Sequence, residues 1–163
     1  MNNMKQFDMA SFFRHLDENE KKVLMERMQS ESFPMGEYIF KQDDAGEKLY
    51  VVEKGTVSLI KSIGNDLDKT VLIAFEGTIF GEFGFIDGRT RSASALVTAD
   101  AILRSLDRKD FDALNKEFPA IGTKLYNNLL VTVTERIRQT SEAHWKTIES
   151  VIKNEKMINP DVT

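Results

Sequence analysis

Cysteine is absent from this 163-residue sequence. The chain therefore forms no disulfide bond, zinc–thiolate site or catalytic thiol, and its composition fits a reducing compartment. No run of apolar residues approaches the roughly 20 that a membrane-spanning helix needs. The first residues, MNNMKQFDMASFF, also lack the basic and apolar regions of a secretory signal peptide. We therefore expect a cytoplasmic protein that does not contact a membrane.

Catalytic motifs are missing as well. The two histidines, His15 and His144, are far apart in the chain, and no Ser/His/Asp set, HExxH motif, Walker loop or spaced carboxylate cluster accompanies them. We expect neither enzymatic activity nor a bound metal. The net charge of -4 gives no general attraction for nucleic acid, so any anion-binding site must be local. The 22 residues after Ser141 are too few for a helix-turn-helix, so we expect this chain not to bind DNA.

The apolar pattern divides the chain into three zones. A helical period before Met28 includes a capping box formed by Asp17 and Glu20. Short apolar runs punctuated by glycine follow from Phe33, and the helical period returns after Asp107. We predict an α+β, mainly β fold: an antiparallel, jelly-roll-like β-roll flanked by N-terminal helices and a long C-terminal helix. The predicted segments are an N-terminal helical segment (1–32), the β-roll (33–107), C-terminal helices (108–157) and a tail (158–163).

The middle zone predicts several strands with no long helix between them. LYVVEKGTVSLI and TVLIAF are rich in β-branched residues, and the GND turn between them (Gly64–Asp66) indicates a hairpin. The later run ASALVTADAILRSL predicts two strands with a break near Ala99 and Asp100. Between these pairs of strands, a short helical turn is expected to begin at Gly81.

The last helix is predicted to begin at Pro119, because proline suits a first helical turn, and to continue to about Lys156. One side of this helix is apolar over most of its length, and the stripe contains Ile121, Leu125, Leu129, Val133, Ile137, His144, Ile148 and Ile152. Such a stripe is longer than a small β-roll can cover, so we expect a homodimer that forms through this helix. Its spacing is nearer to four than to 3.5 residues, which argues against a strict coiled coil.

The stretch FGEFGFIDGRTRSASA, Phe80–Ala95, combines residues that suit a small anion with hydroxyl groups. Unpaired amides at the start of a short helix favour a phosphate, and Gly81 and Gly84 leave room for it. Arg91 can donate two hydrogen bonds to the same anion, whereas Glu82 would repel it and suits a sugar hydroxyl instead. A phosphate beside a hydroxylated sugar indicates a nucleotide. Alternatively, the glycines form ordinary turns and Glu82 pairs with Arg91 on the surface.

This stretch resembles the phosphate-binding cassette of cyclic nucleotide-binding domains, the family of the catabolite activator protein, protein kinase A regulatory subunits and cyclic nucleotide-gated channels. The F-G-E and R-[ST]-A-[ST] elements of the family match Phe80–Glu82 and Arg91–Ser94. The resemblance extends over most of the chain, and its one visible departure is Asp43, where the family usually has a glycine. Aspartate tolerates a left-handed backbone better than most residues, so we expect this turn to be kept.

The resemblance also implies a set of ligand-binding residues. Those around the cyclic phosphate and ribose are Gly81, Glu82, Phe83, Gly84, Arg91, Ser92 and Ala93, of which Glu82 takes the ribose 2′-hydroxyl. Positions that line the base pocket are matched by Leu59 and Val71, and lid positions of the final helix by Arg136, Thr140 and Ser141.

On these grounds we expect a sensor, stand-alone or part of a larger protein, that binds cAMP or cGMP and repositions its C-terminal helix for an unknown downstream partner. The choice between the two nucleotides stays open, and another anionic ligand is an alternative. A second hypothesis is a dimeric scaffold or interaction protein whose pocket is vestigial or filled by its own atoms. The long apolar stripe and Trp145 favour this second hypothesis.

Overall fold

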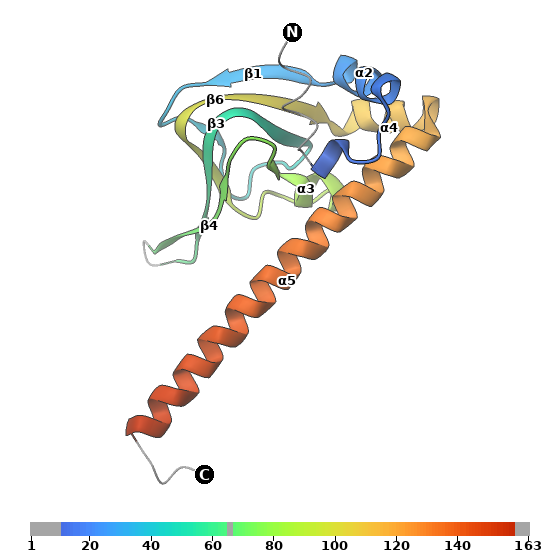
Figure 1. Cartoon of the computed structure of the whole chain (residues 1–163). Coiled ribbons are helices and arrows are strands. Elements are labelled where there is room, and N and C mark those ends of the chain that lie inside the picture. Colours follow the sequence, from blue (N-terminus) through green and yellow to red (C-terminus); the bar gives the residue numbers. More distant parts are fainter. Residues whose placement is uncertain (1–10, 65–66, 159–163) are drawn as a thin grey trace. The chain divides into compact units, whose positions relative to one another are not determined.

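The computed structural model describes residues 11–64 and 67–158, with side chains in the last helix described up to Lys153. In chain order the elements (Figure 1) are η1 (Ser11–Phe13), α2 (Glu18–Arg27), β1 (Gln29–Phe33), β2 (Tyr38–Phe40), β3 (Lys48–Ser62), β4 (Asp68–Ala74), β5 (Ile79–Phe80), α3 (Glu82–Asp87), β6 (Ser94–Asp107), α4 (Arg108–Glu117) and α5 (Pro119–Ile158). The chain divides into two compact units, one up to Leu129 and one from Leu130, so α5 contributes to both. Most of the predicted tail, from 159 onward, lies outside the described residues.

The strands form one antiparallel sheet in the order β1–β6–β3–β4, with β2 paired to β6 and β5 paired to β3. The two long strands, β3 and β6, pair from Lys48 opposite Asp107 to Ile60 opposite Ser94. Figure 1 shows how this sheet curls over itself, with α2 and α4 beside it. The predicted β-roll with N-terminal helices and a long C-terminal helix is confirmed.

The strands β3 and β4 form an antiparallel hairpin that runs from Val57 opposite Ala74 to Ser62 opposite Asp68. This pairing confirms the hairpin predicted around Gly64, although residues 65 and 66 of its turn lie outside the described residues. The strand β4 has a single partner in the sheet, so it forms one edge of the roll.

The strand β6 is continuous over 14 residues, so the break predicted near Ala99 and Asp100 is wrong. The irregularity is accommodated by the partner strand β3, whose pairing shifts register on either side of Gly55. Gly55 has a φ of +91°, and a Cβ at this position would lie 2.3 Å from the carbonyl oxygen of Asp100. Because glycine permits this close approach, β6 continues through the irregularity.

Two buried clusters form the interior of the first unit. One lies within the roll and includes Phe40, Tyr50, Val57, Leu59, Phe80 and Leu103. The other joins the helices to the sheet and includes Phe12, Leu24, Leu49, Phe85, Phe111 and Leu125. The buried Asn128 of α5 fixes η1 to this second cluster, because its Nδ2 donates to the carbonyl oxygens of Phe12 and Arg14 at 2.9 and 2.7 Å.

The helix starts follow local sequence signals. Asp17 and Glu20 form the predicted capping box: Oδ1 of Asp17 accepts from the Glu20 amide at 2.9 Å, and Oε2 of Glu20 accepts from the Asp17 amide at 2.8 Å. The long helix α5 begins at Pro119, as predicted. Asp107 is the N-cap residue of α4, but its side chain accepts no capping hydrogen bond.

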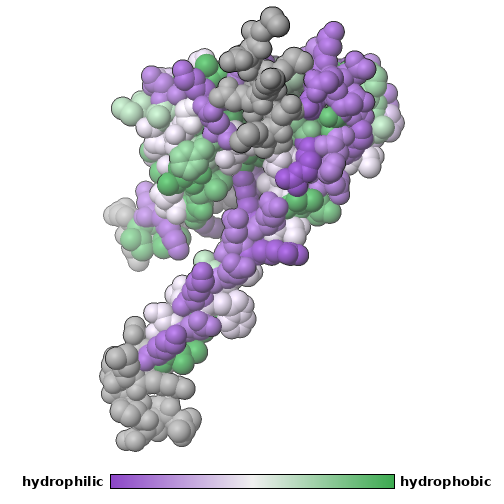
Figure 2. Space-filling view, viewed as in Figure 1, coloured by the Kyte–Doolittle hydropathy of each residue, from purple (hydrophilic) through white to green (hydrophobic). Residues whose placement is uncertain are grey.

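The second unit consists of α5 from Leu130 onward, and exposed apolar side chains follow this part of the helix: Leu130, Ile137, Trp145, Ile148, Val151 and Ile152. In the first unit, by contrast, the residues of the same predicted stripe, Ile121, Leu125 and Leu129, are buried. The face of α5 turned to the viewer in Figure 2 is mainly hydrophilic, with hydrophobic side chains beside it near the far end. Within the described part of the chain, no helix is long and apolar enough to cross a membrane.

Candidate functional site

The cassette stretch lies between β5 and β6 and contains the six-residue helix α3, which has a left-handed glycine at each end. Gly81 is the N-cap residue with φ +77°, and Gly88 is the C-cap residue with φ +70°. The Gly88 amide donates to the carbonyl oxygen of Gly84 at 2.9 Å, which closes the last turn. Residues with a Cβ rarely adopt this conformation, so the turn geometry explains both terminal glycines, and the helix start predicted at Gly81 is confirmed.

Two of the cassette glycines are also positions of close approach. A Cβ at Gly81 would lie 2.7 Å from Nη1 of Arg91. A Cβ at Gly84 would lie 2.7 Å from the carbonyl oxygen of Arg89 and 2.8 Å from the Cα of Gly46. The backbone of α3 therefore packs directly against the loop that precedes β3, and this contact explains Gly84 independently of any ligand.

The guanidinium of Arg91 is almost fully buried, with 4% of the residue exposed. Its Nη1 donates to the carbonyl oxygen of Gly81 at 2.9 Å, whereas its Nε has no hydrogen-bond partner among the described residues. The backbone of Arg91 is held from both sides, since its amide donates to Asp44 and its carbonyl oxygen accepts from Asp43. Asp43 has a φ of +71°, so this residue keeps the left-handed turn where the family usually has glycine.

An aromatic platform lies beneath Arg91. The guanidinium carbon is 4.1 Å from the ring centroid of Phe40 and 5.9 Å from that of Tyr50, and the Tyr50 ring stacks on Phe80 at 5.3 Å. Burial lowers the pKa of Arg91, and Tyr50, Asp44 and Glu82 oppose this effect. Burial also raises the pKa of Tyr50 to about 12, with a further contribution from Glu31. The cation thus lies in a mostly buried environment with two aromatic rings against it.

Glu82 is the first residue of α3, and its side chain is fully buried. A carboxylate in the first turn of a helix is stabilised by the unpaired amides there. It lies close enough to Arg91 to oppose the effect of burial on the arginine pKa. The alternative of a Glu82–Arg91 pair on the surface is wrong, because both side chains are buried.

The other predicted site residues differ in their environments. In the cassette, Ala93 is buried, Ser92 is exposed and Phe83 is 40% exposed. Leu59 of β3 belongs to the buried cluster that contains Phe40, and Val71 of the neighbouring strand β4 is exposed. The predicted contact of each of these residues with a ligand stays a prediction.

The predicted lid residues Arg136 and Thr140 lie on α5 in the second unit. Thr140 is exposed and Arg136 is half-buried. The first unit, by contrast, contains every predicted residue of the cassette and base pocket. The lid role of the two α5 residues stays a prediction.

The aromatic platform formed by Phe40, Tyr50 and Phe80 was not predicted as part of the site. In the sequence these residues only fit the apolar alternation of three strands. Strand pairing brings them together, because Tyr50 of β3 lies opposite Phe80 of β5, while Phe40 belongs to β2. The platform could have been predicted only from the pairing of the strands, which the sequence does not show directly.

Comparison with known proteins identifies the class. Residues 30–118 match the cyclic nucleotide-binding domain, a region that extends from β1 to the end of α4 and includes the whole cassette. This chain belongs to the cyclic nucleotide-binding domain family. The catabolite activator and kinase regulatory subunit resemblance is therefore confirmed at the level of family and fold.

Individual relatives agree with this assignment. The cyclic AMP receptor protein of Thermus thermophilus is 32% identical over 130 residues, which are 80% of this chain and 58% of the receptor. A cAMP-dependent protein kinase regulatory subunit of Candida albicans is 33% identical over 99 residues, which are 61% of this chain and 20% of the subunit. A solved cyclic nucleotide-binding domain from Methylobacillus flagellatus has a TM-score of 0.80 at 26% identity and covers 89% of this chain and 82% of its own. The chain thus spans less than two thirds of both curated relatives.

Proposed function

We propose that this chain is a regulatory module that binds cAMP or cGMP in the cassette and changes the position of α5 in response. The observation that supports this most strongly is the buried guanidinium of Arg91, whose Nε has no hydrogen-bond partner among the described residues. A cation in such an environment is stabilised by an anion that brings charge and acceptors. The curated relatives are named for cyclic AMP, so cAMP is the first nucleotide to test.

In the proposed complex, Arg91 and the amides at the start of α3 hold the cyclic phosphate, and Glu82 accepts a hydrogen bond from the ribose 2′-hydroxyl. The further contacts are Gly81, Phe83, Gly84, Ser92 and Ala93 in the cassette, Leu59 and Val71 at the base, and Arg136 and Thr140 at the lid. Each charge-assisted hydrogen bond contributes about 1.5–3 kcal/mol, whereas micromolar affinity needs about 8 kcal/mol beyond the cost of ordering. The phosphate and ribose contacts alone are marginal, so the base contacts are part of the proposal.

The wider role follows from the same proposal. We place the module in the cytoplasm as a non-catalytic, metal-independent sensor that acts on an unidentified protein partner and does not itself bind DNA. The output we propose is the movement of α5, since this helix extends beyond the first unit and exposes apolar side chains.

Isothermal titration calorimetry with cAMP, cGMP and linear 5′-AMP tests the proposed ligand. We expect about micromolar affinity for at least one cyclic nucleotide and much weaker binding of 5′-AMP. Arg91→Ala should weaken binding by about 100-fold or more, because it removes two charge-assisted hydrogen bonds, and Glu82→Gln should weaken it by about tenfold. Arg89→Ala removes the same charge from an exposed side chain and should bind as the wild type does. Folded wild-type protein that gives no heat with either cyclic nucleotide up to millimolar concentration would contradict the proposal.

A second candidate function, a dimeric scaffold that binds no nucleotide, is favoured by the exposed apolar residues of α5. It differs from the first in a measurable way, because its self-association would be indifferent to cAMP and cGMP.

A further inference from the structure

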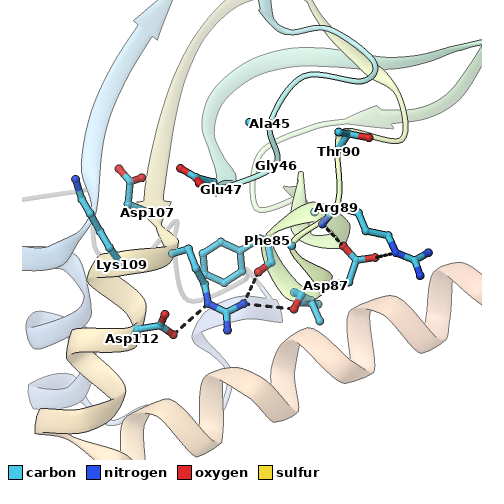
Figure 3. Close-up of a pocket in the computed structure, with 14 residues that line it drawn as sticks. Ala45, Gly46, Glu47, Phe85, Asp87, Arg89, Thr90, Asp107, Lys109 and Asp112 are labelled. Carbon is cyan, nitrogen blue, oxygen red and sulfur yellow. Dashed lines mark hydrogen bonds and ion pairs between the residues drawn. The ribbon is translucent and has the colours of Figure 1, made fainter.

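The first residue of α4, Arg108, contacts the carboxyl end of α3. Its Nη1 donates to the carbonyl oxygen of Phe85 at 2.6 Å and to that of Ile86 at 3.3 Å. Its Nε donates to Oδ1 of Asp112, one turn further along α4, at 3.1 Å. Figure 3 shows two of these interactions as dashed lines, one that reaches the labelled Phe85 and one that reaches the labelled Asp112.

The two carbonyl groups that Arg108 contacts belong to the last turn of a very short helix. In α3 the carbonyl oxygen of Gly84 accepts from Gly88, but those of Phe85 and Ile86 lie beyond the last amide that the helix can offer. A cation at this end also complements the negative end of the helix dipole. Arg108 therefore donates hydrogen bonds to two carbonyl groups that would otherwise depend on water for a donor.

The opposite end of α3 is the proposed phosphate site. A helix of six residues is only about 9 Å long, so a small tilt at its carboxyl end changes the direction of the amides at its start. The ring of Phe85 packs edge-on against Phe111 at 5.4 Å, and this apolar contact is not directional. At its start and middle α3 is held by the bond from Arg91 to Gly81 and by the close packing of Gly84 on Gly46, so the bonds from Arg108 are the directional contacts at its carboxyl end. Hydrogen bonds are directional, so the bonds from Arg108 restrict how the carboxyl end of α3 can tilt.

We propose that Arg108 is a positioning residue for the nucleotide site: it fixes the carboxyl end of α3 to α4, so that the amides at the start of α3 and Glu82 meet the ligand in the right orientation. This inference rests on the proposed cyclic nucleotide binding. Arg108 does not itself touch the ligand, and it acts through the backbone of α3. It also makes α3 and α4 move together when a ligand shifts α3.

The surroundings of Arg108 allow this role to be separated from folding. The side chain of Arg108 borders a cavity of about 720 Å³ between α3, the loop at 45–47 and the start of α4. About a third of this side chain is exposed. Figure 3 shows Glu47, Asp107 and Lys109 around the same cavity. Removal of the guanidinium therefore exposes two carbonyl groups to water rather than opening a void in the core, and the variants should fold.

The test compares Arg108→Gln with Lys109→Gln, which removes the same charge from the next residue of α4 at the edge of the same cavity. Calorimetry with cAMP and cGMP should show about five- to twentyfold weaker binding for Arg108→Gln, by the same factor for both nucleotides, and less than a twofold change for Lys109→Gln. Arg108→Lys retains the charge but not the forked geometry, so its affinity should be intermediate. Asp112→Asn should have a smaller effect in the same direction.

Hydrogen exchange of the ligand-free proteins supplies a readout that does not depend on binding. Amides 86–88 should exchange faster in Arg108→Gln than in the wild type, and unchanged exchange would overturn the proposal. An Arg108→Gln protein with wild-type affinity but a lower melting temperature would also overturn it, because Arg108 would then serve stability alone. If wild-type protein binds neither cyclic nucleotide, the proposed function fails, and the exchange comparison still decides whether Arg108 fixes α3.

Discussion

At the residue scale, Gly81 and Gly88 separate two effects of a side chain in the cassette. Both have a left-handed backbone, but a Cβ at Gly81 would meet Nη1 of Arg91, whereas a Cβ at Gly88 would have no atom within 4 Å. We therefore expect Gly88→Ala to lose only the backbone contribution of about 1–2 kcal/mol to the free energy of unfolding. Gly81→Ala should lose that and also weaken nucleotide binding by at least tenfold, because it displaces Arg91. Urea unfolding and calorimetry on both variants provide the measurement, and equal nucleotide affinities would contradict it.

The buried phenol of Tyr50 should make the free energy of unfolding depend on pH in the alkaline range. Its pKa is raised from 10.0 to about 12, chiefly by burial, so the folded state favours the neutral phenol. The unfolded chain therefore loses this proton at a lower pH than the folded chain, and stability falls as the pH rises from 10 to 12. Two pKa units correspond to at most about 3 kcal/mol.

Replacing Tyr50 with phenylalanine should remove most of this pH dependence. Urea unfolding of Tyr50→Phe and of the wild type from pH 8 to 11.5 provides the measurement, with Tyr38→Phe, a change at an exposed ring, as the control. The two curves should diverge only above about pH 10, and parallel curves would show that Tyr50 titrates as it does in the unfolded chain.

At the scale of the element, the two aspartates that precede helices differ in their capping. Asp17 accepts a hydrogen bond from the Glu20 amide, whereas the side chain of Asp107 accepts none from α4. We expect Asp17→Ala to lower the free energy of unfolding by about 1 kcal/mol, and Asp17→Asn to retain most of it. Asp107→Ala should lose less, since its side chain has only a 3.9 Å ion pair with Lys48. Thermal or urea unfolding that ranks Asp107→Ala as the more damaging change would contradict this.

The elements that could be predicted are those whose signals are local. The capping box at Asp17, the proline at the start of α5 and the glycine before α3 act within one helical turn, so the sequence alone was sufficient. The continuity of β6 was mispredicted because it depends on Gly55 in another strand, which admits the backbone of Asp100. The pairing of strands likewise places Phe40 beneath Arg91, so the platform of the site was invisible until the sheet was known.

At the scale of the whole molecule, α5 carries exposed apolar side chains that a second copy of the chain could bury. Leu130, Ile137 and Ile148 are spaced by about two and then about three helical turns, so they lie on one face of the helix. Charges on this face should prevent the homodimer that the apolar stripe of the sequence predicts. We expect Ile137→Lys combined with Ile148→Lys to give a monomer at concentrations where the wild type is a dimer, as measured by sedimentation velocity.

The matched control places two lysines on the opposite face, as Gln139→Lys combined with Ser150→Lys, and should remain dimeric. Repeating the experiment with saturating cAMP separates the two candidate functions, since only a sensor should change its association or sedimentation on binding. A wild type that is monomeric throughout the micromolar range would contradict the dimer.

The contact between Gly46 and Gly84 has a consequence for anyone who varies this protein. The two positions are far apart in the sequence, but a Cβ on either would collide with the backbone of the other segment. A mutation at one position therefore cannot be rescued by any side chain at the other, because both already have the smallest one. In a random library that varies either position, nearly all variants without glycine there should fail to fold. A library that keeps both glycines and varies other positions should avoid this loss.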